Sequence, residues 1–162
     1  MSSSTNDLVR PKQFSITRRI EIDMAHRIPD HKSKCFNIHG HRYVIEATCT
    51  GNIIEEGEQT GMVMDFGFLK SCMMLCIHDH FDHGAAFYFE DPLVLDGTIN
   101  CKPGWKVCLL TDVPTAENLA KVWYEALKEE IERFFMVKPV KAPRLKHLDV
   151  WETPNCVARY PV

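Results

Sequence analysis

Two stretches of alternating apolar and polar residues restrict the fold of this chain more than any other feature of it. On an extended backbone, side chains two positions apart point to the same face. The first stretch places four side chains on one face: Ile20, Ile22, Met24 and His26. The second places five side chains on one face: His39, His41, Tyr43, Ile45 and Ala47. The sequence therefore predicts two strands that pair antiparallel and are joined by the connection PDHKSKCFNI.

Two further segments have the apolar period of a helix. The first has Asp65 as its expected N-cap and ends before the sequence DHG. Its apolar positions are Phe68, Leu69, Cys72, Met73 and Cys76. The second has Thr115 as its expected N-cap, with Asn118 three residues later. Its apolar stripe consists of Leu119, Val122, Trp123, Ala126, Leu127, Ile131 and Phe134.

The rest of the chain completes a small sheet. A closing hairpin is predicted from RLKHLDVWET and NCVARY, with a turn at the dipeptide PN, whereas residues 84–113 are expected to form a loop with some added strand. The element order predicts an α+β fold, a four-stranded, mostly antiparallel sheet with two helices on one face. Such a sheet has two free edges, which favour pairing with other subunits, so we expect a homo-oligomer. Residues 14–162 would form a single domain, preceded by a polar, flexible lead-in at residues 1–13.

The composition argues against several classes of protein. Of the 162 residues, 45% are hydrophobic and 25% are charged, which is enough to build a core. The formal net charge is -3 and no stripe of lysine or arginine occurs, so we expect no nucleic-acid partner. No apolar run is long enough to span a bilayer, and the first residues have no secretory signal. The seven cysteines are irregularly spaced, which argues against a disulfide framework and favours a cytoplasmic, reducing compartment.

A candidate metal site lies where the two alternating stretches meet. His39 and His41 can chelate one ion, because side chains two apart on a strand share a face. His26 lies on the same face of the neighbouring strand, so three imidazoles can converge. Three neutral imidazoles with an open fourth position are typical of catalytic zinc. Two alternatives stay open: the histidines are ordinary surface or core residues, or Cys35 completes a closed, structural zinc site.

A second histidine-rich stretch, IHDHFDHG, follows the first predicted helix. An aspartate beside a histidine can orient an imidazole that passes protons, which makes Asp82 and His83 candidates for a proton relay. The alternative is a polar turn after a helix. We expect His78 and His80 to lie at a solvated helix end, where histidine suits the negative end of the helix dipole.

Five motifs occur in an order that is specific in combination: AHRIPDHKSKCFNIHGHRY, TGMVMDFGFLK, FDHG, PTAENLA and WETPN. With them, residues 14–160 resemble the family of 6-pyruvoyl- and 6-carboxy-tetrahydropterin synthases. The resemblance implies the tunnelling fold, in which subunits join edge strands into a trimeric β-barrel and two trimers stack into a homohexamer. It implies Zn²⁺ on His26, His39 and His41, where the ion would polarise the hydroxyls of the substrate side chain. Cys35 would be the general base, because a thiol beside a dication is readily deprotonated.

The resemblance also implies roles for the remaining site residues. Asp82 and His83 would form a relay supplied from a neighbouring subunit. Glu152 would anchor the pterin, because one carboxylate can accept both the 2-amino group and the adjacent ring N–H. Thr115 and Glu117 match the family's second pterin-pocket segment.

The spacing of the motif favours one branch of this family. Three residues separate Cys35 from His39, as in the carboxy branch. The resemblance therefore implies a zinc-dependent lyase that converts 7,8-dihydroneopterin triphosphate to 6-carboxy-5,6,7,8-tetrahydropterin, with release of acetaldehyde and triphosphate, in queuosine biosynthesis. The alternatives are a 6-pyruvoyl-tetrahydropterin synthase, a related enzyme on another pterin or purine, and a non-catalytic zinc-binding oligomer. Four cations near the motif are candidates for binding the triphosphate: Arg27, Lys32, Lys34 and Arg42.

Overall fold

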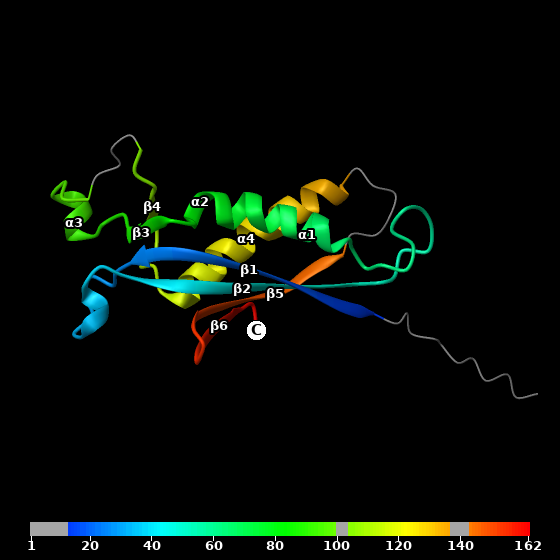
Figure 1. The fold of residues 1–162 in the computed structure, drawn as a ribbon, viewed down its shortest axis with the longest axis horizontal. Helices are drawn as coiled ribbons and strands as arrows, with labels where there is room; N and C mark the ends of the chain where they lie inside the picture. Colours follow the sequence, from blue (N-terminus) through cyan, green and yellow to red (C-terminus); the bar gives the residue numbers. More distant parts are fainter. Residues whose placement is uncertain (1–12, 100–103, 137–142) are drawn as a thin grey trace, which may run out of the picture.

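The computed structural model describes residues 13–99, 104–136 and 143–162. Its ribbon (Figure 1) is built on a mixed six-stranded sheet with the strand order β4-β3-β1-β2-β5-β6. The strands are β1 (Phe14–His26), β2 (His39–Gly51), β3 (Gly84–Tyr88), β4 (Val107–Leu110), β5 (Arg144–Thr153) and β6 (Cys156–Tyr160). The lead-in expected at residues 1–13 lies, except for its last residue, outside the described residues.

The long hairpin of β1 and β2 forms the centre of the sheet, as the alternating patterns predict. The two strands pair antiparallel along their whole length, from Phe14 opposite Gly51 to His26 opposite His39. The predicted inward side chains are buried: Ile20, Ile22 and Met24 on β1, and Tyr43, Ile45 and Ala47 on β2. Because the register decides which residues face each other, this pairing also places the histidines.

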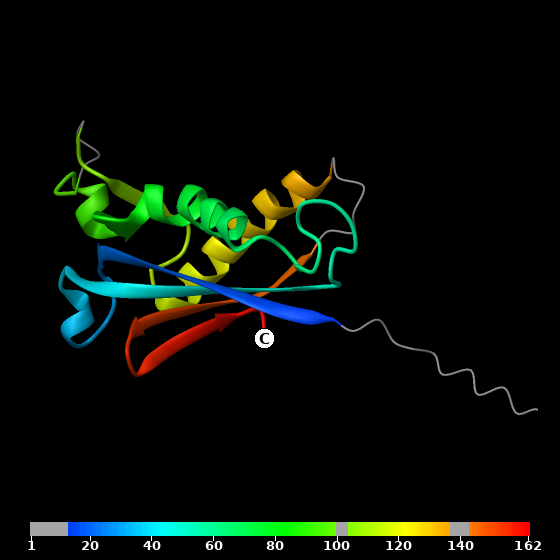
Figure 2. The same ribbon diagram turned by 45° about the vertical axis from the view of Figure 1, so that its right-hand side comes forward.

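Two helical segments cover one face of the sheet, as Figures 1 and 2 show. The first helical segment consists of α1 (Phe66–Met73), the π-helical turn η2 (Met74–His78) and α2 (Asp79–Phe81). The second helical segment is α4 (Ala116–Phe135). Both predicted N-caps are confirmed, because the Asp65 carboxylate accepts the backbone N–H of Phe68 at 2.9 Å and Thr115 Oγ1 accepts that of Asn118 at 3.3 Å. The apolar stripes meet the sheet in one core that includes Tyr43, Leu69, Met73, Trp123 and Leu127.

The predicted count of four strands is wrong, and residues 84–113 explain the difference. They add β3 and β4 at one edge of the sheet, with the short helix α3 (Pro92–Leu95) between them. β3 pairs parallel with the end of β1, where His26 lies opposite Ala86, and β4 pairs parallel with β3. Apolar runs of this length are too short for periodicity to separate a strand from a loop. The antiparallel arrangement holds for β1, β2, β5 and β6, and the closing hairpin turns at Pro154 as predicted.

The opposite face of the sheet carries charged pairs between neighbouring strands and has no helix over it in the described part of the chain (Figure 2). Arg42 donates twice to Asp23 on this face, and Arg159 donates twice to Asp149. β1 pairs with β3 only from Met24 onward, and the backbone of Asp23 bonds to Asp82 and His83, so the residues of β1 before Asp23 present a free backbone edge within the described chain. Pairing of this edge with another copy stays a prediction. No described helix is both long and apolar enough to cross a membrane.

Candidate metal centre

Three histidine side chains converge at the end of the β1–β2 hairpin, as the alternation predicts. The register places His26 opposite His39 and Met24 opposite His41. One ring nitrogen of each histidine lies within 4.8 Å of the others, and the ring centroids are 4.5, 5.0 and 5.2 Å apart. Gly40 separates the two histidines of β2, and a Cβ there would meet the Met24 carbonyl oxygen at 3.3 Å. A glycine at this position therefore lets the two strands approach closely where the imidazoles meet.

Backbone carbonyl groups orient two of the three imidazoles. His26 Nδ1 lies 2.7 Å from the carbonyl oxygen of Pro114, and His39 Nδ1 lies 2.8 Å from that of Asn37. A carbonyl oxygen can only accept, so in each ring Nδ1 carries the proton and Nε2 keeps its lone pair. Metal-binding histidines are oriented in this way, by donation from the second ring nitrogen. The atoms that remain available to an ion are the Nε2 atoms.

Burial favours the neutral form of two of the three imidazoles, those of His26 and His41. His26 is 1% exposed, and burial lowers its pKa although the Pro114 carbonyl acts in the opposite direction. Burial also lowers the pKa of His41. The Nε2 atom of His41 is buried, and no hydrogen-bond partner for it occurs among the described residues. Three converging imidazoles, one of them with an unpartnered buried nitrogen, form a donor set that suits a zinc ion.

Tyr43 and Glu152 lie beside the three histidines. Glu152 Oε1 is 3.5 Å from His26 Nε2 and 3.9 Å from His41 Nε2. The Tyr43 hydroxyl donates to Glu152 Oε1 at 3.3 Å and lies 3.2 Å from His26 Nε2. Burial, followed by the negative charge of Glu152, raises the pKa of Tyr43, so the phenol stays protonated. The sequence predicts Tyr43 only as a buried strand residue. The signal for its contact with the histidines is its position two residues after His41, on the same face of the strand.

Cys35 lies in η1 (Lys34–Phe36), a single turn of 3₁₀ helix in the connection between β1 and β2. Its carbonyl oxygen accepts the backbone N–H of Ile28 at 2.8 Å. A negative charge on Cys35 is the smallest of the four effects that raise the pKa of Tyr43. Within the described part of the chain, the group of mutually close donor atoms contains the three histidines and not Cys35. The cysteine therefore lies outside the cluster, in the connection that joins the strand ending at His26 to the strand beginning at His39.

Asp82 and His83 form a hydrogen-bonded pair at the end of the first helical segment. His83 Nδ1 donates to Asp82 Oδ2 at 2.7 Å, and Asp82 Oδ1 accepts the backbone N–H of Asp23 at 2.9 Å. The Asp23 N–H, and then His83, lower the pKa of Asp82. The His83 side chain is 79% exposed and lies outside the histidine cluster of its own described chain. His78 and His80 belong to the helix end, as predicted, although His78 is half-buried with Nε2 3.5 Å from Asp82 Oδ2.

The two residues expected in the second pterin-pocket segment lie at the N-terminus of α4. Thr115 follows Pro114, whose carbonyl oxygen orients His26, and its own hydroxyl caps the helix. Glu117 is exposed in the first turn of α4. Thr115 is thus adjacent in the chain to Pro114, which bonds to His26, while the side chain of Glu117 faces solvent.

The four candidate cations for a triphosphate differ in their availability. Arg27 is buried and pairs with Asp91, so it is not free to bind a ligand. Arg42 pairs with Asp23 across the hairpin, and it lines a hollow that His41 and Glu152 also line. Lys32 and Lys34 are exposed in the connection that contains the cysteine, so these two lysines and Arg42 remain the candidates.

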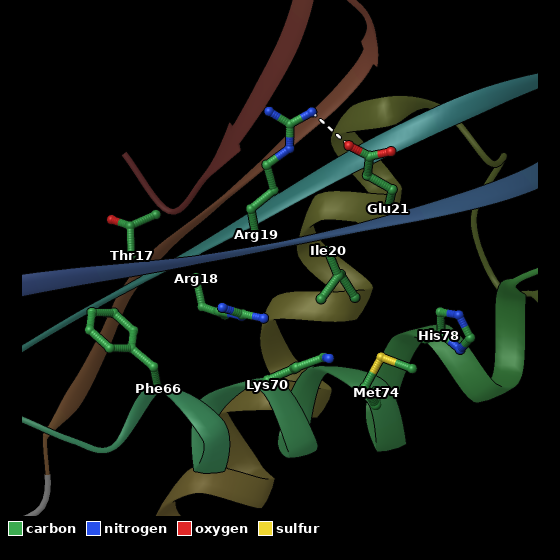
Figure 3. A pocket seen from close by; sticks show the side chains of 9 residues that line it. All are labelled: Thr17, Arg18, Arg19, Ile20, Glu21, Phe66, Lys70, Met74 and His78. Carbon is green, nitrogen blue, oxygen red and sulfur yellow. Dashed lines mark hydrogen bonds and ion pairs between the residues drawn. The ribbon is translucent and has the colours of Figure 1, made fainter.

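Two of the hollows that border the sheet bear on the candidate site and on the free edge of β1. One has a volume of about 690 Å³ and is lined by residues of β1, β2 and β5, among them His41 and Glu152. Its size and its position beside the cluster suit a small-molecule ligand. The other, of about 750 Å³, lies between β1 and the first helical segment and is lined by Arg18, Lys70 and His78, among others (Figure 3). None of the three clustered histidines lines this second hollow.

Residues 15–161 match the family model described as 6-pyruvoyl tetrahydropterin synthase. The chain belongs to this family. A relative from Rickettsia conorii, named 6-carboxy-5,6,7,8-tetrahydropterin synthase, is 38% identical over 141 residues, which cover 86% of this chain and 94% of the relative. A relative of the same name from Haemophilus influenzae is 29% identical and covers 91% of this chain and 98% of its own length.

Solved structures of the 6-pyruvoyl tetrahydropterin synthase family have the same fold. The Caenorhabditis elegans 6-pyruvoyl tetrahydropterin synthase superposes with a TM-score of 0.62 at 26% identity, over 93% of this chain and 96% of that chain. The Plasmodium falciparum 6-pyruvoyl tetrahydropterin synthase superposes with a TM-score of 0.67 at 16% identity, over 91% of this chain and 96% of that chain. The family resemblance inferred from the sequence motifs is confirmed.

Proposed function

We propose that this member of the 6-pyruvoyl tetrahydropterin synthase family is a zinc-dependent lyase of the 6-carboxy branch. Its substrate is 7,8-dihydroneopterin triphosphate, and its products are 6-carboxy-5,6,7,8-tetrahydropterin, acetaldehyde and triphosphate, in the queuosine pathway of the cytoplasm. The observation that carries the proposal is the convergence of three imidazole nitrogens beside the carboxylate of Glu152. The names of curated relatives at 38% and 29% identity support it.

The reaction balances without an external oxidant or reductant. The bond between C3′ and the triphosphate oxygen breaks, and so does the bond between C1′ and C2′. Acetaldehyde contains C2′ and C3′, while C1′ becomes the carboxylate, whose second oxygen comes from one water molecule. The ring gains the two hydrogens that the side chain loses, so the chemistry is a series of proton transfers and eliminations.

The protein's own groups supply these proton transfers in the proposal. The three histidine Nε2 atoms hold the zinc ion, which when bound supplies Lewis acidity towards the hydroxyls of the substrate side chain. Cys35, as a thiolate, accepts the proton that leaves the side chain. His83, oriented by Asp82, accepts or returns protons on the other side of the reacting carbons.

Glu152 anchors the pterin in this proposal. A carboxylate accepts the 2-amino group and the adjacent ring N–H at the same time. The Tyr43 hydroxyl donates to Glu152 Oε1 and so restrains the carboxylate in the hollow that also contains His41. Thr115 and Glu117 contribute the second side of the pocket.

Assembly into a trimer or a dimer of trimers forms part of the same proposal. The free edge of β1 borders the hollow of Figure 3, where Arg18 Nε is buried without a hydrogen-bond partner among the described residues. A second copy that extends the sheet at this edge would cover the hollow. In the same proposed arrangement, His83 of one subunit lies beside the three histidines of its neighbour. Light scattering should give three or six times the chain mass of 18.7 kDa. A monomer at working concentrations would contradict this part of the proposal.

A 6-pyruvoyl-tetrahydropterin synthase is the second candidate. The matching family model carries that description, and the solved structure of that name from Caenorhabditis elegans is 26% identical. Both reactions release triphosphate, so only the organic products distinguish them.

The decisive experiment incubates the zinc-loaded protein with 7,8-dihydroneopterin triphosphate and resolves the products by mass spectrometry. Acetaldehyde with a carboxylated pterin supports the proposal, and a pyruvoyl pterin alone supports the second candidate. No turnover by a zinc-loaded chain would instead favour a non-catalytic zinc-binding oligomer. Cys35→Ala should keep zinc and lose turnover, whereas loss of zinc would make Cys35 a ligand. Cys156→Ala, at an exposed position on β6, is the control.

A further inference from the structure

A buried ion pair connects residues 84–113 to the end of β1. Arg27, which follows His26, is 5% exposed, and Asp91, between β3 and α3, is 0% exposed. Arg27 Nε lies 3.2 Å from Asp91 Oδ2. The two atoms are not aligned as a hydrogen bond, so the contact is electrostatic. Removal of one partner would leave the other charge buried and uncompensated, so each residue depends on the other.

The Arg27 guanidinium also contacts the turn that contains Cys35. Its Cζ atom lies 4.6 Å from the centroid of the Phe36 ring, within the range of a cation–π interaction. Phe36 is 48% exposed, so the core does not hold this ring. The Ile28 N–H donates to the Cys35 carbonyl oxygen at 2.8 Å. The residues directly after His26 thus hold η1 through a ring contact and a backbone hydrogen bond.

Asp91 is itself fixed by the segment to which it belongs. Its Oδ1 accepts the backbone N–H of Leu93 at 2.9 Å and so caps α3, while its own N–H donates to the Tyr88 carbonyl oxygen at 3.0 Å. β3 runs parallel to the end of β1, which carries Asp91 towards Arg27. Figure 1 shows α3 and the loop of η1 at the same end of the molecule as the end of β1. The carboxylate therefore reaches Arg27 from a restrained backbone.

We propose that Asp91 is a positioning residue, which through Arg27 and Phe36 holds η1, and with it the Cys35 thiol, beside the three histidines. The inference deepens the proposed function, because it assigns residues 84–113 a part in the reaction that Cys35 serves. Asp91 acts at a distance in this account and contacts neither the ion nor the substrate.

The test is Asp91→Asn, which keeps an oxygen able to cap α3 and removes the charge beside Arg27. We expect zinc content to stay at the wild-type value, kcat to fall by about 10- to 100-fold, and KM to change much less. Iodoacetamide should alkylate Cys35 several-fold faster than in the wild type, with the exposed Cys156 as the internal reference. Asp96→Asn is the matched control, because Asp96 is exposed in the same segment and its carboxylate accepts from the nearby Thr98, through the backbone N–H and the side chain.

A second variant covers the case in which Asp91→Asn does not fold. Arg27→Lys keeps a positive charge beside Asp91 but removes the planar group from the Phe36 ring, so it should fold and still accelerate alkylation of Cys35. Wild-type alkylation of Cys35 in Arg27→Lys, or in a folded Asp91→Asn, would overturn the proposal. Loss of zinc in either variant would also overturn it, because the ion pair would then support the metal ligands.

Alkylation of Cys35 requires no turnover, which separates this inference from the proposed reaction. If the wild-type protein leaves 7,8-dihydroneopterin triphosphate unchanged while Asp91→Asn still exposes Cys35, the lyase is rejected and the positioning contact is retained. If the wild type turns over and the variants match it in kcat and in alkylation, the lyase is retained and the positioning role is rejected.

Discussion

Replacement of His41 by alanine should have different consequences in the metal-free and the zinc-loaded protein. Without an ion, His41 Nε2 is buried and has no hydrogen-bond partner among the described residues. Such a group costs about 1–3 kcal/mol, and alanine removes this cost together with the packing of the ring. Because the two changes oppose each other, we expect the free energy of unfolding of the metal-free protein to change by less than about 1 kcal/mol.

In the zinc-loaded protein, the same substitution removes one of the three converging nitrogens. Free zinc at about 100 times its Kd stabilises a native protein by about 2.7 kcal/mol. In a chain of this size, about 1 kcal/mol corresponds to roughly 2–4 °C in Tm. The wild type should therefore gain about 5–11 °C on addition of zinc, while His41→Ala should gain little at the same concentration.

Thermal unfolding followed by circular dichroism, in chelator and in zinc, tests both halves of this prediction. The control is His80→Ala, which removes an exposed imidazole from α2 and should respond to zinc as the wild type does. An equal loss of Tm for His41→Ala in chelator and in zinc would refute the reasoning, since the ring would then matter for packing alone. A wild-type response of the variant to zinc would place the ion elsewhere.

Three other predictions address the relay, the core and the thiols. Asp82 accepts from His83 Nδ1 through one oxygen and from the Asp23 N–H through the other, and the amide of Asp82→Asn has only one accepting oxygen and no negative charge. Steady-state turnover should therefore fall by roughly 10²- to 10⁴-fold; unchanged kinetics would remove the pair from the reaction. Trp123→Ala should lower the free energy of unfolding in urea by about 3–5 kcal/mol, because this side chain is fully buried, and a loss below about 1 kcal/mol would contradict its place in the core. Burial raises the pKa of Cys49 to about 12, so at pH 8 peptide mass spectrometry should find iodoacetamide on the exposed Cys156 and not on Cys49; labelling of both at equal rates would show that the core opens.

The sequence predicts the parts of this structure that have a long apolar period. The apolar pattern of the β1–β2 hairpin has the period of a strand over many residues, and that of α4 has the period of a helix, so both patterns predict which side chains face the core. The same alternation predicts that His26 faces the same side of the sheet as His39 and His41. The two capping residues were also predictable, because a cap depends on neighbours in the chain. These local signals were enough to place three ligands of the candidate centre.

The remaining features depend on contacts between distant residues. β3 and β4 are each too short for a periodic signal, so the sequence predicts only a loop with some added strand at residues 84–113 and gives neither the bounds nor the pairing of the two strands. Arg27 was one of four candidates for binding the triphosphate, because its sequence neighbours give no sign of the buried Asp91. The hydrogen bond from His26 to Pro114 uses a backbone carbonyl, which leaves no mark on residue type.

That hydrogen bond has a consequence for how the protein would acquire the proposed ion. All three candidate ligands lie within residues 26–41, so a short synthetic peptide would contain every proposed donor atom. The carbonyl oxygen that turns the His26 ring, however, belongs to the residue two positions before α4, and it arrives only when that helix has docked on the sheet. A nascent chain leaving the ribosome would therefore contain the three histidines long before it could bind the ion tightly. Metal loading would then be a late step that takes place on folded molecules.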